Sequence, residues 1–165
     1  MGDWDHEVPQ IDSIDRRLIK LLQQNGRMST CKIAAELDCL SDRAVRYRLD
    51  RLQRDQLIRV SAIVCTSRLG WPIMGDVFLD IMPWKLEEII QHLSSDERVC
   101  YIAASPDHKQ VSFQTKGRDR ADLMRVVGEI TGGLEGIVAI RVAPLTRLVR
   151  DVTGWLPPTD DDLSL

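Results

Sequence analysis

A cluster of arginines between Arg43 and Arg54 is the part of this sequence best suited to chemistry. Residues 41–54 read SDRAVRYRLDRLQR and place five guanidinium groups within twelve residues. A guanidinium is planar and permanently charged, and its N–H donors match two acceptors on a guanine edge or the oxygens of one phosphate. These residue types therefore indicate recognition of a polyanion, provided that the surrounding elements present them outward.

The spacing over residues 42–55 predicts a helix that Ser41 caps. At about 100° per residue, Val45, Leu49 and Leu52 form one apolar side. The opposite side and the N-terminal end of the helix would then meet DNA. The first four polar residues after the cap would lie in the major groove, and the last two arginines, Arg51 and Arg54, would contact phosphates. The predicted DNA-binding residues are Ser41, Asp42, Arg43, Arg46, Tyr47, Arg51 and Arg54.

Arg48 flanks the apolar side of this helix, so we assign it a structural role. Its stem can lie on the core while its head pairs with a carboxylate such as Asp15 or Glu36. A plain solvated helix face is the alternative for the whole segment, because acidic residues interleave with the arginines and would form local ion pairs. The elements that come before the helix weigh against that alternative.

Two shorter helices are predicted before the arginine-rich one. Asp12 caps the first, which buries an apolar stripe and ends at Asn25-Gly26, two residues that tolerate a left-handed conformation. Ser29 caps the second, and residues 38–40 make a tight turn into the third helix. This order is helix-turn-helix spacing. Residues Leu57–Val64 then alternate as a strand, which would supply a wing or a link to the next domain.

Charge and composition agree with a nucleic-acid-binding segment joined to a different domain. The chain has 165 residues, 44% of them hydrophobic and 28% charged, as in an ordinary globular protein. Residues 12–60 contain 11 Lys and Arg against 7 Asp and Glu, whereas the whole chain has a net charge of −3. The first residues are acidic, and the uncharged stretches, such as Leu69–Gly75, are all too short for a bilayer. We therefore expect a cytoplasmic protein with no membrane partner.

Catalysis, cofactors and metals find little support among the residues. His6 lies near the N-terminus, His92 falls on a helix surface, and His108 lies in a loop without a nucleophile or a second ligand beside it. The four cysteines form no CxxC pair, and reduced, buried thiols are the expectation. We predict neither catalytic residues, nor a cofactor, nor a metal site. The four cysteines are Cys31, Cys39, Cys65 and Cys100.

The second half of the chain predicts an α+β domain. Short apolar or alternating runs and two amphipathic stripes follow in the order β-α-β-β-α-β, which is the split βαβ, ferredoxin-like pattern. Two helices cover one face of such a sheet, so the other face argues for a partner subunit. The expected segments are a flexible start at 1–10, a helix-turn-helix domain at 11–62, a linker at 63–76, the ferredoxin-like domain at 77–152 and an acidic tail at 153–165.

Tryptophans mark both ends of the chain and two loops. The stretch Trp155–Pro158, followed by Asp160–Asp162, predicts a flexible tail, although Trp4 and Trp155 would alternatively attach the termini to another subunit. Trp71 and Trp84 fall near strand ends and would line an interdomain or dimer contact.

The sequence resembles the Lrp/AsnC (feast/famine) family of transcriptional regulators over Ile11 to about Val152. The residues that carry the resemblance are the run IDRRLIKLLQQNGR at 14–27, Ile33-Ala34, Leu37, Leu40-Ser41, Val45, Arg48, Leu49, Leu52, Ile58 and Gly136-Ile137-Val138. The resemblance implies a winged helix-turn-helix followed by a βαββαβ domain of the RAM or ACT type. It also implies homodimers built by the β-sheets, larger rings such as octamers, double-stranded DNA as partner, and effectors such as amino acids bound at interfaces.

Two positions depart from the family pattern. Such regulators usually have Gly where Gln56 stands, and a side chain in a left-handed helix end costs about 1 kcal/mol. The loop Ser105–Gln110 has Asp107 and Gln110 where the family favours Gly and Asp. Ser105, Asp107, His108 and Gln110 are therefore the candidate effector-binding residues, with altered or absent amino-acid sensing expected.

Two other functions compete with the regulator interpretation. Sirohaem decarboxylases share this fold but need haem-contacting His and Arg residues in the C-terminal half, a pattern that is absent from this sequence. An interaction or sensing module that has lost DNA affinity is the other alternative. The outward set Arg43, Arg46 and Tyr47 opposes it.

Overall fold

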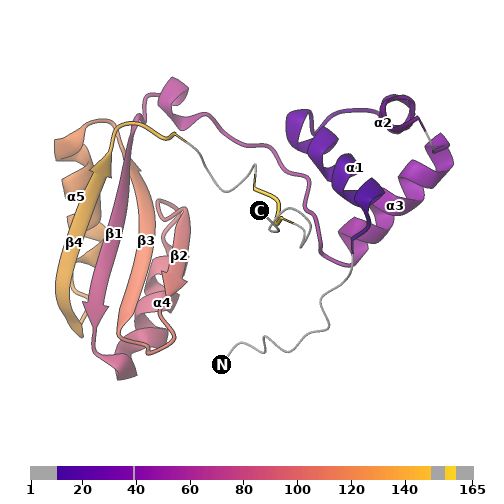
Figure 1. Cartoon of the computed structure of the whole chain (residues 1–165). Helices are drawn as coiled ribbons and strands as arrows, with labels where there is room; N and C mark the ends of the chain where they lie inside the picture. The colour runs from indigo at the N-terminus through magenta and orange to yellow at the C-terminus, as the bar shows by residue number, and fades with distance from the viewer. Residues whose placement is uncertain (1–10, 39, 150–154, 159–165) are drawn as a thin grey trace, which may run out of the picture. The chain divides into compact units, whose positions relative to one another are not determined.

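The computed structural model describes residues 11–38, 40–149 and 155–158 (Figure 1). The chain divides into two compact units, Met1–Ile63 with Arg150–Leu165, and Val64–Val149. None of the helices in the described ranges has both the length and the apolar character that crossing a membrane requires. Cys39, Trp4 and His6 lie outside the described residues, as does the acidic run at 160–162.

Three helices form the first unit, and local capping sets where each begins. They are α1 (Ser13–Gln24), α2 (Thr30–Leu37) and α3 (Asp42–Arg54). The side chains of Asp12, Ser29 and Ser41 each accept a hydrogen bond from a backbone N–H of the first turn. Because these N–H groups have no partner within the helix, the caps fix the three starts as the sequence predicts.

The ends of α1 and α2 differ from each other in conformation. Asn25 after α1 has φ −149°, so the expected left-handed end is wrong there, although the helix ends at the expected place. Asp38 after α2 has φ 58° and is left-handed. The helices enclose one apolar cluster, whose fully buried members are Leu18, Ile33, Leu37, Val45 and Leu52.

The strand predicted over residues 57–64 is wrong, so of its two predicted roles, a wing or a link to the next domain, only the link remains. Residues 57–64 are all described and form no strand. The backbone N–H groups of Leu57 and Ile58 donate to the carbonyl oxygen of Leu52 at 2.9 and 3.2 Å, and both side chains pack on the helical cluster. Further along, Ile63 is 71% exposed. Alternation alone does not make a strand, because a ladder needs a second strand to accept its hydrogen bonds.

The second unit is a four-stranded antiparallel sheet in the order β2-β3-β1-β4. Its elements are β1 (Ile73–Ile81), α4 (Leu86–Ser95), β2 (Tyr101–Ala104), β3 (Gln110–Gly117), α5 (Arg120–Thr131) and β4 (Ile137–Leu145), with 3₁₀ turns η1 (Thr66–Leu69) and η2 (Pro83–Lys85). Both α-helices cover the same face of the sheet (Figure 1). The βαββαβ prediction is confirmed, with β1 beginning inside the expected linker because it pairs along its whole length with β3 and β4.

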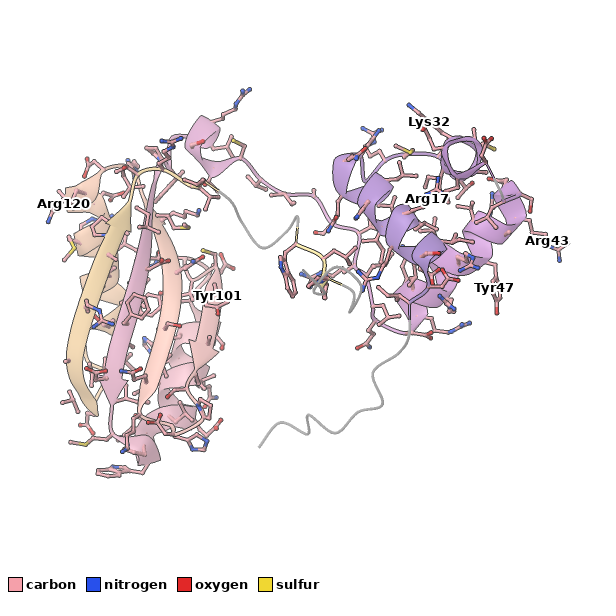
Figure 2. The ribbon with its side chains drawn as sticks, in the orientation of Figure 1. Arg17, Lys32, Arg43, Tyr47, Tyr101 and Arg120 are labelled. Carbon is pink, nitrogen blue, oxygen red and sulfur yellow. The ribbon has the colours of Figure 1, made fainter. Side chains whose placement is uncertain are left out.

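Alternation along the strands separates a core face from an open face. Val77 and Leu79 are fully buried under the helices, beside Phe113 of β3. On the other face, the Arg141 guanidinium lies 4.8 Å from the ring centroid of Phe78, and Tyr101 is 52% exposed. The sheet therefore presents aromatic side chains on a face that its own helices leave uncovered (Figure 2).

The prediction that the cysteines are buried is wrong for every described cysteine, although their thiols are free as expected. Cys31, Cys65 and Cys100 are exposed free thiols. Cys31 lies in α2 two residues before the buried Ile33, Cys65 precedes a 3₁₀ turn among exposed residues, and Cys100 precedes β2. His92, by contrast, is exposed on α4 as expected, with its Nε2 3.0 Å from the carbonyl oxygen of Ile130.

Candidate nucleic-acid interface

The outer side of α3 presents cations and an aromatic ring to solvent. Tyr47 is 67% exposed, and the side chains of Arg46 and Arg54 are 66% and 68% exposed. Arg43 and Tyr47 project from α3 away from the body of the helical unit (Figure 2). Helical spacing causes this, because Val45 and Leu52 turn the other side of α3 into the core. The arrangement suits contact with a groove and its phosphates.

The N-terminal end of α3 is ordered by its first residues. Ser41 Oγ accepts the Ala44 N–H at 3.2 Å, so its hydroxyl is the N-cap. Asp42 pairs with Arg46 across 3.4 Å, one turn along the helix. The Thr30 hydroxyl of α2, with a smaller contribution from Arg46, holds the pKa of Asp42 below its usual value. Asp42 is therefore charged at neutral pH, and its ion pair holds Arg46 near Arg43 and Tyr47, the other residues predicted to contact bases.

The inner side of α3 is held by a buried carboxylate on α1. Asp15 is fully buried, and its Oδ1 accepts the Arg48 guanidinium at 2.8 Å, while its Oδ2 pairs with Arg51. Arg48 also reaches Asp12 at 2.6 Å, and the Asp12 N–H donates to Asp15 at 3.2 Å in a capping box. The predicted structural role of Arg48, paired with Asp15, is confirmed.

Arg51 belongs to this inner network rather than to the outer surface. Its side chain is 30% exposed, compared with 68% for Arg54, and its charge is matched by Asp15. A guanidinium that is ion-paired inside its own unit must break that pair before it takes a phosphate. Contrary to our prediction from the sequence, we therefore do not propose that Arg51 contacts a phosphate. Arg48 and Arg51 lie on the same face of α3 because they are three positions apart in the helix.

Sequence reasoning did not single out the cations of the first two helices. Lys32 is exposed in the first turn of α2, a helix that packs against α3 (Figure 2). Arg17 is exposed on α1 and donates to the carbonyl oxygen of Glu36 at 3.3 Å. Lys32 could have been singled out from the sequence, because it follows the cap Ser29 by three residues and so lies in the first turn of the helix that precedes α3.

The candidate effector residues lie around a cavity of about 430 Å³ in the β-sheet unit. It is lined by Asp80, Ile81, Pro83, Asp107, Lys109, Gln110 and Val138. Two of the four predicted residues, Asp107 and Gln110, thus line it. Ser105 does not line the cavity but donates to Asp107 at 2.5 Å, and this bond, with the Lys109 N–H, lowers the pKa of Asp107. His108 has φ 60° at the tip of the loop. Among the described residues, no three potential metal ligands gather.

The helical unit now permits a comparison with known domains. Residues 11–53, which include α1, α2 and nearly all of α3, match the AsnC-type helix-turn-helix domain. These residues are an AsnC-type helix-turn-helix domain. The capped α1, the buried Asp15 and the exposed side of α3 all belong to this AsnC-type domain, and the predicted resemblance is confirmed.

Relatives of this chain extend over both units. An uncharacterised HTH-type transcriptional regulator of Pyrococcus abyssi is 28% identical over 140 residues, which are 84% of this chain and 88% of the relative. Ptr1 of Methanocaldococcus jannaschii, named an HTH-type transcriptional regulator, is 26% identical over 84% of this chain and 86% of its own. This chain is thus similar to transcriptional regulators along most of its length.

Solved structures share the whole two-unit fold. AsnC of E. coli superposes with a TM-score of 0.77 at 16% identity, covering 88% of this chain and 99% of AsnC. A transcriptional regulator of Neisseria meningitidis, solved as its complex with L-methionine, gives a TM-score of 0.79 at 16% identity, covering 90% of this chain and 97% of its own. The predicted fold, a helix-turn-helix domain followed by a ferredoxin-like domain, is confirmed. The comparisons give no support to the sirohaem decarboxylase alternative.

Proposed function

We propose that this AsnC-type protein binds double-stranded DNA as a homodimer and regulates transcription, without enzymatic activity, in the cytoplasm. The observation that carries the proposal is the exposed N-terminal half of α3. There Arg43, Arg46 and Tyr47 stand outward on a helix whose cap and buried ion pairs fix its orientation. A preordered helix with outward arginines reads base edges without first having to fold.

The roles of these residues differ along α3. Arg43 is in the first turn, where recognition helices touch bases, so we propose that it donates its paired N–H groups to a guanine. Tyr47 lies one turn further along and would contact bases or sugars. Arg54, 68% exposed at the C-terminal end, would contact a phosphate. Phosphate contacts give affinity on all sequences, whereas base contacts give preference.

The homodimer proposal rests on the open face of the β-sheet. A sheet that exposes Phe78 and Tyr101 on the face that its helices do not cover leaves apolar surface that a second copy would bury. Two helix-turn-helix units per dimer then imply a roughly palindromic operator, with half-sites separated by one or more helical turns. Sedimentation equilibrium of the wild type and of Phe78→Asp tests this: a monomeric wild type would contradict it.

Selection of genomic fragments by the purified protein, followed by gel shifts over a range of salt concentrations, tests DNA binding. Each phosphate contact should make log K fall with log salt by about 0.9. Arg43→Ala should relax preference for one base at a cost of about 1–3 kcal/mol on the selected site and little on random DNA. Negligible binding of every fragment at low salt would refute the proposal.

The cavity around Asp107 is our proposed effector site. Two carboxylates, of Asp80 and Asp107, and the ammonium group of Lys109 line it, which complements the opposite charges of a free amino acid. The regulator that shares this fold was solved with L-methionine. In this chain Asp107 stands where the family favours glycine, so the backbone cannot approach the ligand as closely as glycine permits. Instead, the Asp107 carboxylate would bind the ammonium group of the amino acid. Calorimetric titration with the twenty amino acids, repeated on Asp107→Asn, tests this: heats that the variant leaves unchanged would contradict it.

A further inference from the structure

The C-terminal segment Trp155–Pro158 lies on the helix-turn-helix unit, although the chain reaches it only after the whole β-sheet unit. Leu156 is partly buried and packs against the apolar cluster of the three helices. On α1, the Arg16 guanidinium donates a 2.5 Å hydrogen bond to the carbonyl oxygen of Pro157. An apolar anchor and a charge-assisted hydrogen bond therefore act on neighbouring residues of one short segment. This contact was not anticipated from the sequence, which favours a flexible tail.

The contact changes how the two units are connected. The chain passes from the helical unit to the β-sheet unit after Ile63, and Trp155 belongs again to the helical unit. Six residue steps separate Val149, the last described residue of the β-sheet unit, from Trp155. An extended chain covers at most about 3.6 Å per residue, so these six steps span no more than roughly 22 Å, and docking of the segment turns them into a short second connection to the helical unit. Without docking, the chain connection at Ile63 is the one remaining tether between the two units.

We propose that the helical unit carries a docking surface for the chain's own C-terminal segment, and that this docking is a second tether between the DNA-binding unit and the β-sheet unit. The seated segment itself identifies the occupant. Two tethers in parallel restrict how far a helical unit moves from its β-sheet unit, as a shorter linker would. This restriction has a consequence in the proposed DNA-binding dimer, on which the DNA experiment below depends. It narrows the range of half-site separations at which both α3 helices of the dimer can bind at once.

Leu156→Ala is the variant that releases the segment, and Pro158→Ala is its matched control because Pro158 is exposed. Neither change touches α3. The thermal midpoint of the helical unit should fall by about 4 °C or more in Leu156→Ala, and by less than about 1 °C in Pro158→Ala. An unchanged midpoint in Leu156→Ala would overturn the docking surface, whatever the protein does with DNA.

The tether is then tested with DNA duplexes that carry two copies of the selected half-site. Their separation is varied by whole helical turns, about 10.5 base pairs each, and one duplex carries a single half-site. Wild type and Pro158→Ala should prefer one separation by about tenfold or more, and Leu156→Ala should reduce that preference at least threefold while binding the single half-site equally well. An unaltered separation profile in Leu156→Ala would overturn the second tether. Loss of all DNA binding in the wild type would instead refute the proposed function.

Discussion

Asp15 is the group on which the orientation of α3 depends, and Asp15→Asn tests this directly. The carboxylate is fully buried on α1 and is shared by two arginines of α3, Arg48 and Arg51. Asparagine has the same shape and keeps one oxygen for the Asp12 N–H that completes the capping box. It removes the negative charge and turns an N–H₂ group toward a guanidinium. The change therefore isolates the ion pairs from the packing.

The expected loss follows from the contacts that the carboxylate makes. Each hydrogen bond to a charged group contributes roughly 1.5–3 kcal/mol, and Asp15→Asn weakens two of them. The side chains of Arg48 and Arg51 are 22% and 30% exposed, so each regains some hydration when its partner is neutral. We therefore expect a loss of about 3 kcal/mol in the free energy of unfolding of the helical unit, at the low end for breaking a buried ion pair.

Urea unfolding of the full chain, followed through the amide NMR signals of each unit, measures this loss. With a slope of about 1–3 kcal/mol per molar urea, the midpoint of the helical unit should fall by at least about 1 M, and that of the β-sheet unit should not change. Asp12→Asn is the control, because asparagine caps equally well and the Asp12 side chain is 50% exposed, so its ion pair contributes less than about 1 kcal/mol. Equal losses in the two variants would refute a special role for Asp15.

Three further predictions concern other parts of the molecule. Gln56 has φ 56°, so Gln56→Gly should raise the stability of the helical unit by roughly 0.5–1 kcal/mol in thermal unfolding, and a lower midpoint would contradict this. The Arg98 guanidinium lowers the pKa of Asp96 from 3.8 to about 2, so its charged form stabilises the fold above pH 4 and this contribution is lost as pH falls through 2. Asp96→Asn should cost about 1 kcal/mol at pH 7, after allowance for solvent screening, and progressively less as pH falls toward and below 2; a cost independent of pH would count against the pair. In gel shifts, Arg54→Met should reduce the salt slope by about 0.9, whereas Arg51→Met should leave it unchanged.

Features with a local physical cause could be predicted from the sequence. The cap residues Asp12, Ser29 and Ser41 act within three residues of themselves, and all three accept the backbone N–H that they were expected to accept. The two amphipathic stripes predicted in the second half correspond to α4 and α5, which bury them in the core of the β-sheet unit, because periodicity reports which side of a helix faces inward. The left-handed backbone at Gln56 was also predictable, since glycine usually stands at that position of the family pattern.

Features that depend on a distant partner could not be predicted in this way. Residues 57–64 alternate like a strand, but the described structure gives them no second strand to pair with. Leu156 resembles part of a flexible tail until the helical core that it covers is known. Exposure of Cys31 follows from its place on the outer side of α2, which composition does not report. In each case the missing information was which other segment lies next to the residue.

The arginines of α3 show why charge alone overstates the DNA-binding surface. Five guanidinium groups on one helix suggest five phosphate or base contacts, yet Asp15 on another helix holds Arg48 and Arg51. Arg43, Arg46 and Arg54 are left as exposed cations. Arg46 pairs with Asp42 and Arg54 with Asp55, each at 3.4 Å, in solvent-screened pairs that DNA can displace. If all three met phosphates, α3 would contribute a salt slope of about −2.7 per subunit, compared with −4.5 for all five. The buried acid therefore sets both the orientation of α3 and the number of cations that remain free on its outer side.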